Sequence, residues 1–119
     1  MRREARRSAP SRPRVVLVQG PSMEPTLRAG DCLLVRPGAA VRPGDVVVAR
    51  FPGGPATLVV KRAVRPAEGG WWLESDNPLV TDDSRRYGPA VVTAVVVLRY
   101  WPLPPTMLRR PALPRRRTR

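Results

Sequence analysis

The sequence contains no histidine, one cysteine and one lysine among its 119 residues. Without histidine, a serine nucleophile cannot be activated by an imidazole, so any serine-based hydrolysis must use another base. One cysteine excludes an internal disulfide, and the lack of histidine beside it argues against a structural zinc site. We therefore expect neither a metal nor a cofactor, and we interpret Cys32, in DCLLV, as a small core residue.

Long apolar runs are also missing. The longest, RVVLVQ and AVVTAVVVL, are far shorter than the ~20 residues that a helix needs to span a bilayer. No apolar stretch of signal-peptide length follows the N-terminal arginines. We therefore expect a protein that has no transmembrane anchor and is cytoplasmic.

The net charge of +13 is concentrated at the two ends of the chain. Residues 1–14 hold six arginines and one glutamate, residues 109–119 hold six arginines and no acid, and ten basic and eight acidic residues lie between them. We expect residues 1–13 and 103–119 to be flexible tails. No aromatic residue is interleaved with these arginines, so we expect no specific nucleic-acid partner, and weak contacts with anionic surfaces are the alternative role.

Between the tails, short segments rich in Val, Leu and Trp alternate with Pro and Gly. The expected strands are residues 15–19, 32–36, 45–51, 57–64, 71–74 and 91–100. No window shows a sustained helical stripe with caps. The pattern predicts a mostly β domain over residues 14–102, an antiparallel barrel or sandwich of short strands.

The only lysine lies in the expected strand TLVVKRAV (57–64). Because side chains alternate along a strand, the residues on its face are Thr57, Val59, Lys61 and Ala63. On composition alone, Lys61 is the one lysine that an arginine-rich sequence has kept. A desolvated lysine can, however, lose its proton, whereas a guanidinium stays charged, so Lys61 is also a candidate general base.

A candidate nucleophile precedes it. Ser22 stands between a proline and a methionine in GPSMEPTLRAGD (20–31), a segment that also fits a simple turn. Ser/Lys variants of the catalytic triad pair such a serine with a lysine base. A third group should orient the lysine, and SDNPLVTDDSRRYG (75–88) is dense in hydroxyls and carboxylates, although taken alone it fits a polar loop.

Taken in order, these segments resemble the signal peptidase I-like family of Ser/Lys proteases over roughly residues 17–88. The resembling boxes are GPSMEPTLRAGD, GDVVVARF, LVVKRAV and SDNPLVTDDSR. The resemblance implies a signal peptidase I-type catalytic β domain and serine endopeptidase activity. It also implies that Ser22 is the nucleophile, Lys61 the general base and Thr81 the hydroxyl that orients the lysine, with the Ser22 backbone N–H as oxyanion donor.

The same resemblance assigns further positions. Met23, Leu27 and Val59 match positions that line the pocket for the substrate residue before the scissile bond. This pocket implies that the substrate has a small side chain at that residue. Gly20 stands where some members have a serine that provides a second oxyanion donor. Structural residues near the site are matched by Asp76, Asn77, Asp83 and Arg85. Ser75 departs from the family, which has a glycine at this position.

With no anchor expected, a soluble subgroup, the nickel-type superoxide dismutase maturation proteases, fits better. It looks similar over RPGDVVVARF, LVVKRA and GGWWLESDNP. This similarity implies that the partner is a precursor protein, a nickel superoxide dismutase precursor, from which a short N-terminal propeptide is removed. Three alternatives stay open: a self-cleaving repressor of the SOS-response type, a signal peptidase-like enzyme acting on exported proteins, and a non-catalytic basic binding module.

Overall fold

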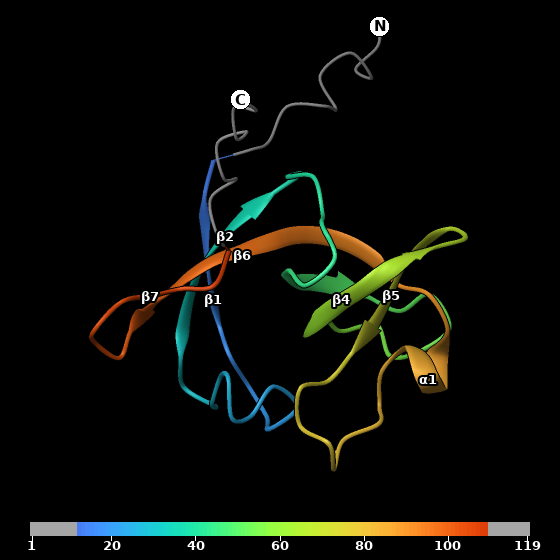
Figure 1. Ribbon diagram of the computed structural model, residues 1–119, viewed down its shortest axis with the longest axis horizontal. Coiled ribbons are helices and arrows are strands. Elements are labelled where there is room, and N and C mark those ends of the chain that lie inside the picture. The colour runs from blue at the N-terminus through green and yellow to red at the C-terminus, as the bar shows by residue number, and fades with distance from the viewer. Residues whose placement is uncertain (1–11, 110–119) are drawn as a thin grey trace, which may run out of the picture.

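The computed structural model describes residues 12–109, which form a sheet of antiparallel strands with one short helix (Figure 1). The strands are β1 (Arg14–Leu17), β2 (Cys32–Pro37), β3 (Val46–Arg50), β4 (Val59–Ala67), β5 (Gly70–Glu74), β6 (Val91–Trp101) and β7 (Thr106–Met107). The helix α1 (Ser84–Tyr87) lies between β5 and β6. The predicted mostly β, antiparallel fold is confirmed, while residues 1–11 and 110–119 of the expected tails lie outside the described residues.

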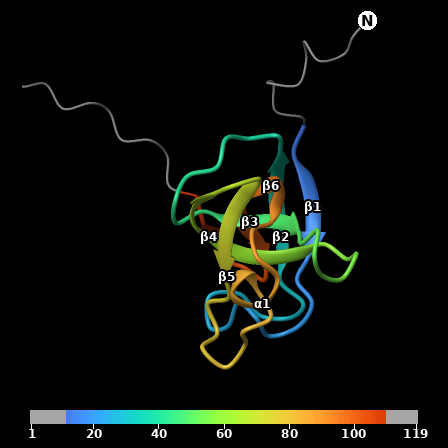
Figure 2. The ribbon, with the colours of Figure 1, turned by 90° about the vertical axis from the view of Figure 1, so that its right-hand side faces the viewer.

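The strands are hydrogen-bonded in the order β1-β2-β6-β3-β4-β5, and β7 also pairs with β6. β6, with 11 residues, is the longest strand and lies between β2 and β3, so it joins the two halves of the sheet (Figure 1). Figure 2 shows the same sheet from the side. A bridge between Trp71 of β5 and Ala90, immediately before β6, brings the far end of the sheet back to its middle. The sheet therefore curls into a partly closed barrel made of β3, β4, β5 and the start of β6.

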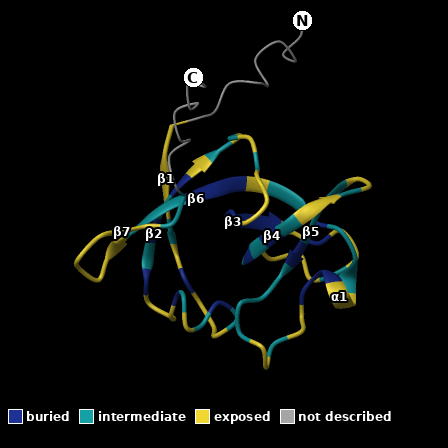
Figure 3. Cartoon of the chain, viewed as in Figure 1, coloured by how far each residue is buried: buried dark blue, intermediate teal, exposed yellow. Residues whose placement is uncertain are grey.

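The core is divided by β3, whose apolar run VVVA is buried on both faces (Figure 3). Val46 and Val48 belong to a hydrophobic cluster that also contains buried residues of the segment between β1 and β2. Val47 and Ala49 belong to a second cluster, formed with β4, β5 and the segment before β6. Burial of both faces explains why β3 shows no alternation of apolar and polar residues. β3 therefore packs against the segment that carries the candidate nucleophile Ser22 and pairs with the strand that carries the candidate base Lys61.

The folded part extends further than the sequence predicts, because the expected domain ends at residue 102. β7 pairs with Leu98 and Arg99 of β6. Arg109 forms an ion pair with Asp45 at 3.4 Å and donates a hydrogen bond to the Ala40 carbonyl at 2.6 Å. The proline-rich stretch WPLPP conceals this short strand, since proline is typical of turns and tails. Residues 103–109 therefore pack against the sheet.

The helix α1 is a single turn that the sequence pattern does not reveal. The Asp83 carboxylate caps it by accepting a hydrogen bond from the Arg85 backbone N–H at 3.1 Å. Four residues are too few to show a helical period. No helix in residues 12–109 combines the length and the apolar character needed to cross a membrane.

Candidate active site

Ser22 lies in the segment between β1 and β2, where tight turns fix the chain. The Glu24 backbone N–H donates to the Pro21 carbonyl at 3.1 Å, and the Leu27 N–H donates to the Met23 carbonyl at 2.9 Å. The side chains of Met23 and Leu27 are each only 1% exposed and pack into the first hydrophobic cluster. The buried side chains of Met23 and Leu27 thus fix this segment to the core, and the neighbouring Ser22 remains half-buried.

Gly20, two residues before Ser22, has a φ of +84°. This left-handed conformation is unfavourable for any residue with a Cβ and is readily adopted by glycine. A built Cβ would meet nothing within 4 Å, so backbone conformation and not space selects glycine here. The position at which the motif resemblance expects a second oxyanion donor in some family members is therefore occupied by a glycine that the turn itself requires.

Lys61 lies in β4, opposite Val47 of β3. Its side chain is 4% exposed, and it shares the buried face of the strand with Ala63, as the period of two predicts. Burial lowers the pKa of the Lys61 amine, although the negative charges of Asp83 and Asp82 act in the opposite direction. The environment therefore shifts the amine towards the uncharged form that a general base requires.

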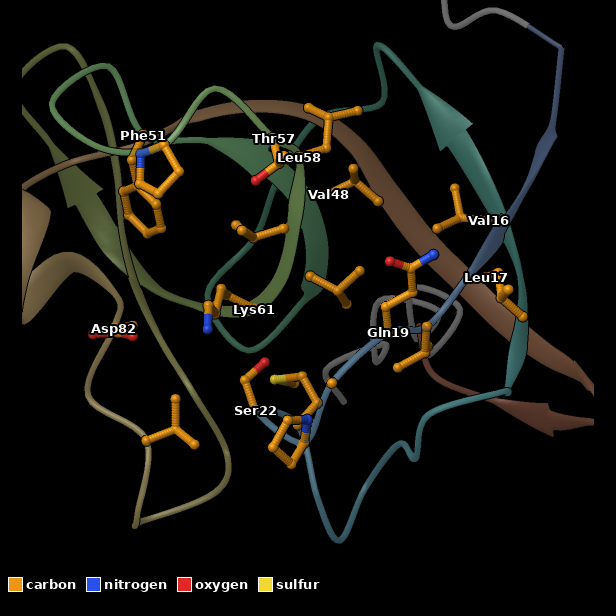
Figure 4. Close-up of a pocket in the computed structure, with 18 of the residues that line it drawn as sticks. Val16, Leu17, Gln19, Ser22, Val48, Phe51, Thr57, Leu58, Lys61 and Asp82 are labelled. Carbon is orange, nitrogen blue, oxygen red and sulfur yellow. The ribbon is translucent and has the colours of Figure 1, made fainter.

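Ser22 and Lys61 line the same pocket, which has a volume of about 600 Å³. Figure 4 shows the Ser22 hydroxyl and the Lys61 amine facing one another across it. Three further predicted residues, Gly20, Met23 and Val59, also line the pocket. Its walls come mainly from residues 16–23, at the end of β1 and after it, and residues 55–61, before β4 and at its start. An uncharged amine facing a hydroxyl in a mostly apolar pocket can accept the hydroxyl proton.

The amine is held by a residue that the motif comparison does not assign. Lys61 Nζ donates to Ser75 Oγ at 3.0 Å. Within the described range, no hydrogen bond joins Lys61 to Thr81, which is exposed and does not line the pocket. Arg62 of β4 pairs with Glu74 of β5, so the next antiparallel position brings Ser75 opposite Lys61. The departure from glycine at this position was the available signal for Ser75.

The last box is organised around Asp83, which is completely buried. Its carboxylate accepts hydrogen bonds from Arg85 Nε at 3.0 Å and Nη2 at 2.7 Å, and from the Ser75 backbone N–H at 2.8 Å. Burial alone would raise the pKa of Asp83, but these hydrogen bonds and the Arg85 charge outweigh it and lower the pKa to about 2. Asp83 therefore remains ionised and fixes the backbone beneath the lysine.

Asp76 and Asn77 connect this box to the serine segment, and the two loops lie side by side in Figures 1 and 2. Asp76 accepts from Thr26 Oγ1 at 2.6 Å and from Arg62 Nη2 at 2.6 Å. The Asn77 backbone N–H donates to the Ser22 carbonyl at 2.9 Å, and its side-chain amide donates to the Pro21 carbonyl at 3.0 Å. These contacts determine where the serine lies relative to the lysine.

Two of the residues predicted to be catalytic or substrate-binding do not line the pocket. Leu27, expected in the pocket, is instead part of the first hydrophobic cluster beneath the serine segment and does not line the pocket. Thr81 lies on the exposed loop before Asp83. In the part of the chain that the structure describes, no group of three or more His, Cys, Asp or Glu side chains is placed to hold a metal ion.

Comparison with known proteins gives consistent matches. The model of the Peptidase S24-like family matches residues 4–96. The chain is 35% identical over 116 residues to the mitochondrial inner membrane protease subunit 1 of Xenopus tropicalis, covering 75% of this chain and 70% of that protein. Proteins of the same name from Homo sapiens (31% identical, covering 75% and 70%) and Schizosaccharomyces pombe (33% identical, covering 76% and 74%) are also similar. No solved structure gives a significant match.

Proposed function

Because the chain belongs to the Peptidase S24-like family and is a serine peptidase with signal peptidase I-like relatives, we propose that Ser22 is its nucleophile and Lys61 its general base. The observation that carries this assignment is the buried amine of Lys61 facing the Ser22 hydroxyl in one pocket. The sequence contains no histidine, so an imidazole base is not an alternative. Family membership also sets aside the reading of the chain as a non-catalytic binding module.

In the proposed reaction, Ser22 Oγ attacks the scissile carbonyl while its proton passes to the uncharged Lys61 amine. The Ser22 backbone N–H stabilises the oxyanion of the tetrahedral intermediate. When the C–N bond breaks, the Lys61 ammonium returns the proton to the leaving amine. Water then attacks the acyl-enzyme and gives a proton to Lys61. When the ester C–O bond breaks, the Lys61 ammonium returns this proton to Ser22 Oγ, and the released carboxylic acid loses its proton to solvent.

Replacement of Ser22 by alanine tests the assignment. The wild-type protein would be incubated with a mixed peptide library, and new termini would be identified by mass spectrometry. Ser22→Ala should retain its circular dichroism spectrum and lose at least about a thousandfold in rate, because the nucleophile itself is gone. Cleavage at a rate near the wild-type value in the Ser22→Ala protein would refute the proposal. Intact-mass measurement of the protein incubated alone tests the alternative of self-cleavage.

We propose that the substrate is a precursor protein with a short N-terminal extension and a small residue before the cut. The support is the apolar pocket around Met23 and Val59 and the motif resemblance described above. A nickel superoxide dismutase precursor is the specific candidate. Co-expression of the two proteins, followed by intact-mass analysis of the precursor, should show loss of the extension with the wild-type protease and not with Ser22→Ala. An uncleaved precursor beside an active protease would eliminate this substrate.

The names of the relatives favour a second candidate, a precursor held at a membrane. The same peptide library separates the two possibilities, because the residues around the preferred cut can be compared with those of each precursor. A cut site found only next to an apolar segment would support the membrane-held precursor.

A further inference from the structure

A serine hydroxyl outside the assigned set lies against the Lys61 amine. Ser75 Oγ accepts a hydrogen bond from Lys61 Nζ at 3.0 Å, and the lysine is almost completely buried. We propose that Ser75 is the residue that positions Lys61 for proton transfer with Ser22, in place of Thr81. This inference rests on the function proposed above and specifies how its base is held.

Two features fix the position of Ser75: the pairing of β5 with β4 and a hydrogen bond to the buried Asp83. Ser75 directly follows β5, and the β4–β5 register brings it opposite Lys61. Its backbone N–H donates to the buried Asp83 carboxylate at 2.8 Å. Asp83 is itself held by its ion pair with Arg85 at 2.7 Å. The hydroxyl is therefore presented by a strand end and a buried ion pair, which leave it little freedom to move.

The residues after Ser75 extend the same support to the nucleophile. Asp76 is paired with Arg62, the neighbour of Lys61, and the Asn77 backbone N–H binds the Ser22 carbonyl. Residues 75–77 thus contact the base, the strand that carries the base, and the nucleophile. A hydroxyl in this segment is placed to orient the amine with respect to Ser22.

Thr81 is in a different situation. Its side chain is exposed on the loop, and its carbonyl accepts a hydrogen bond from the Asp83 backbone N–H at 2.9 Å. Among the described residues, the Lys61 amine donates to Ser75 and no hydrogen bond joins it to Thr81. The structure therefore assigns Thr81 a part in the shape of the loop and leaves the contact with the amine to Ser75.

The chemistry suits a hydroxyl at this position. By accepting one N–H of the uncharged amine, Ser75 leaves the nitrogen lone pair free to point at Ser22. The charged groups that face Lys61 are Asp82 and Asp83, which favour the ammonium, and Arg85, which opposes it. A hydroxyl adds no further charge to this set. Because it accepts from the ammonium too, its removal should lower the pKa of Lys61 further.

The single lysine allows a direct test without a substrate. In protein labelled with lysine carrying ¹³C at Cε, Lys61 gives one side-chain signal, whose chemical shift can be followed with pH. We expect Ser75→Ala to move the titration midpoint to lower pH. Ser75→Thr, which keeps the hydroxyl, and Thr81→Ala should leave the midpoint close to the wild-type value. If the alanine variant does not fold, Ser75→Gly is measured instead. Glycine also removes the hydroxyl and keeps the backbone N–H that donates to Asp83.

Kinetics on the best library peptide provide the second readout. Ser75→Ala should lower kcat about tenfold, as expected for one orienting hydrogen bond, with KM little changed because Ser75 does not line the pocket. Ser75→Thr should recover most of the loss. The inference is overturned if Ser75→Ala leaves kcat and the titration midpoint unchanged, or if Thr81→Ala shifts both. If one of these results is found while Ser22→Ala is inactive, only the role of Ser75 is refuted and the Ser22/Lys61 assignment stands. If Ser22→Ala is active, the Ser22/Lys61 assignment itself is refuted.

Discussion

At the scale of single residues, the proposed reaction depends on the charge of one buried amine. Burial lowers the pKa of Lys61, and only the uncharged form can accept the Ser22 proton. Cleavage should therefore increase as pH rises through the lowered pKa and decrease as pH falls below it. Lys61→Arg should be inactive at every pH, since a guanidinium stays protonated.

A pH profile of kcat/KM reports this ionisation in the free enzyme. The profile should follow the Lys61 titration curve measured by NMR in the same buffer. A rate that declines over the pH range in which the lysine loses its proton would contradict the role of Lys61 as a base.

The sequence indicates Ser22 and Lys61 because both lie in short motifs, and because Lys61 is unusual in a chain otherwise rich in arginine. It does not indicate Ser75 as the partner of the lysine. That contact arises from the pairing of β4 with β5, which sets residues opposite one another that lie 14 positions apart in sequence. Leu27 illustrates the same limit, because a motif position does not reveal whether a side chain faces the pocket or the core.

At the scale of secondary-structure elements, Asp83 links α1, the end of β5 and the loop between them. Its folded-state pKa of about 2 lies below the ordinary pKa of an aspartate. The ionised Asp83 therefore stabilises the fold fully at pH values above that ordinary pKa. Asp83→Asn should lower the free energy of unfolding by about 2 kcal/mol near neutral pH.

Urea unfolding at several pH values tests this prediction. The stabilisation by Asp83 is lost as pH falls through its folded-state pKa, so the difference between the two proteins should narrow towards pH 2. Asp82→Asn is a matched control, because its ion pair with Arg86 is solvent-exposed and contributes little. A difference between wild type and Asp83→Asn that is independent of pH would show that charge is not the cause.

The closure of the barrel depends on Gly70 at the start of β5. A Cβ at this position would lie 2.0 Å from the Ala90 carbonyl oxygen, within the bridge that returns β5 to β6. Gly70→Ala should therefore destabilise the protein by roughly 2 kcal/mol or more. Gly53→Ala is the control, since its Cβ would meet the Tyr87 carbonyl at an ordinary 3.4 Å. Equal thermal unfolding temperatures for the two variants would refute the prediction.

Most strands could be located from sequence because Val-rich runs bounded by Pro and Gly match elements buried on one or both faces. α1 and β7 could not. α1 is four residues long and depends on Asp83 as its cap, and β7 contains two residues that pair only because β6 is long enough to reach them. Elements this short are defined by their tertiary partners and not by local preference.

At the scale of the whole molecule, the segment after β6 completes the core. Leu108 packs against the first hydrophobic cluster, and its backbone N–H donates to the Val97 carbonyl at 2.9 Å. Arg109 pairs with Asp45, which immediately precedes β3. We expect a chain that ends at residue 102 to be less stable than one that ends at residue 109, by about 1–3 kcal/mol for the lost burial and hydrogen bonds.

Chemical denaturation of the two truncated proteins measures this difference. Leu108→Ala in the longer chain serves as a control that removes the apolar contact and keeps β7. Indistinguishable midpoints for the chains ending at 102 and 109 would place residues 103–109 outside the cooperative unit.

The position of β1 has a consequence for how the protein behaves at high concentration. Among the described residues, β1 pairs only with β2, so one side of its backbone is open, and Val15 and Leu17 are 61% and 52% exposed beside it. Such an edge is a template on which a second molecule can add a strand, the first step of aggregation. Arg12 and Arg14, both exposed at its start, bring like charges together when two such edges meet. Self-association should therefore be suppressed at low ionic strength and should increase as salt screens these arginines.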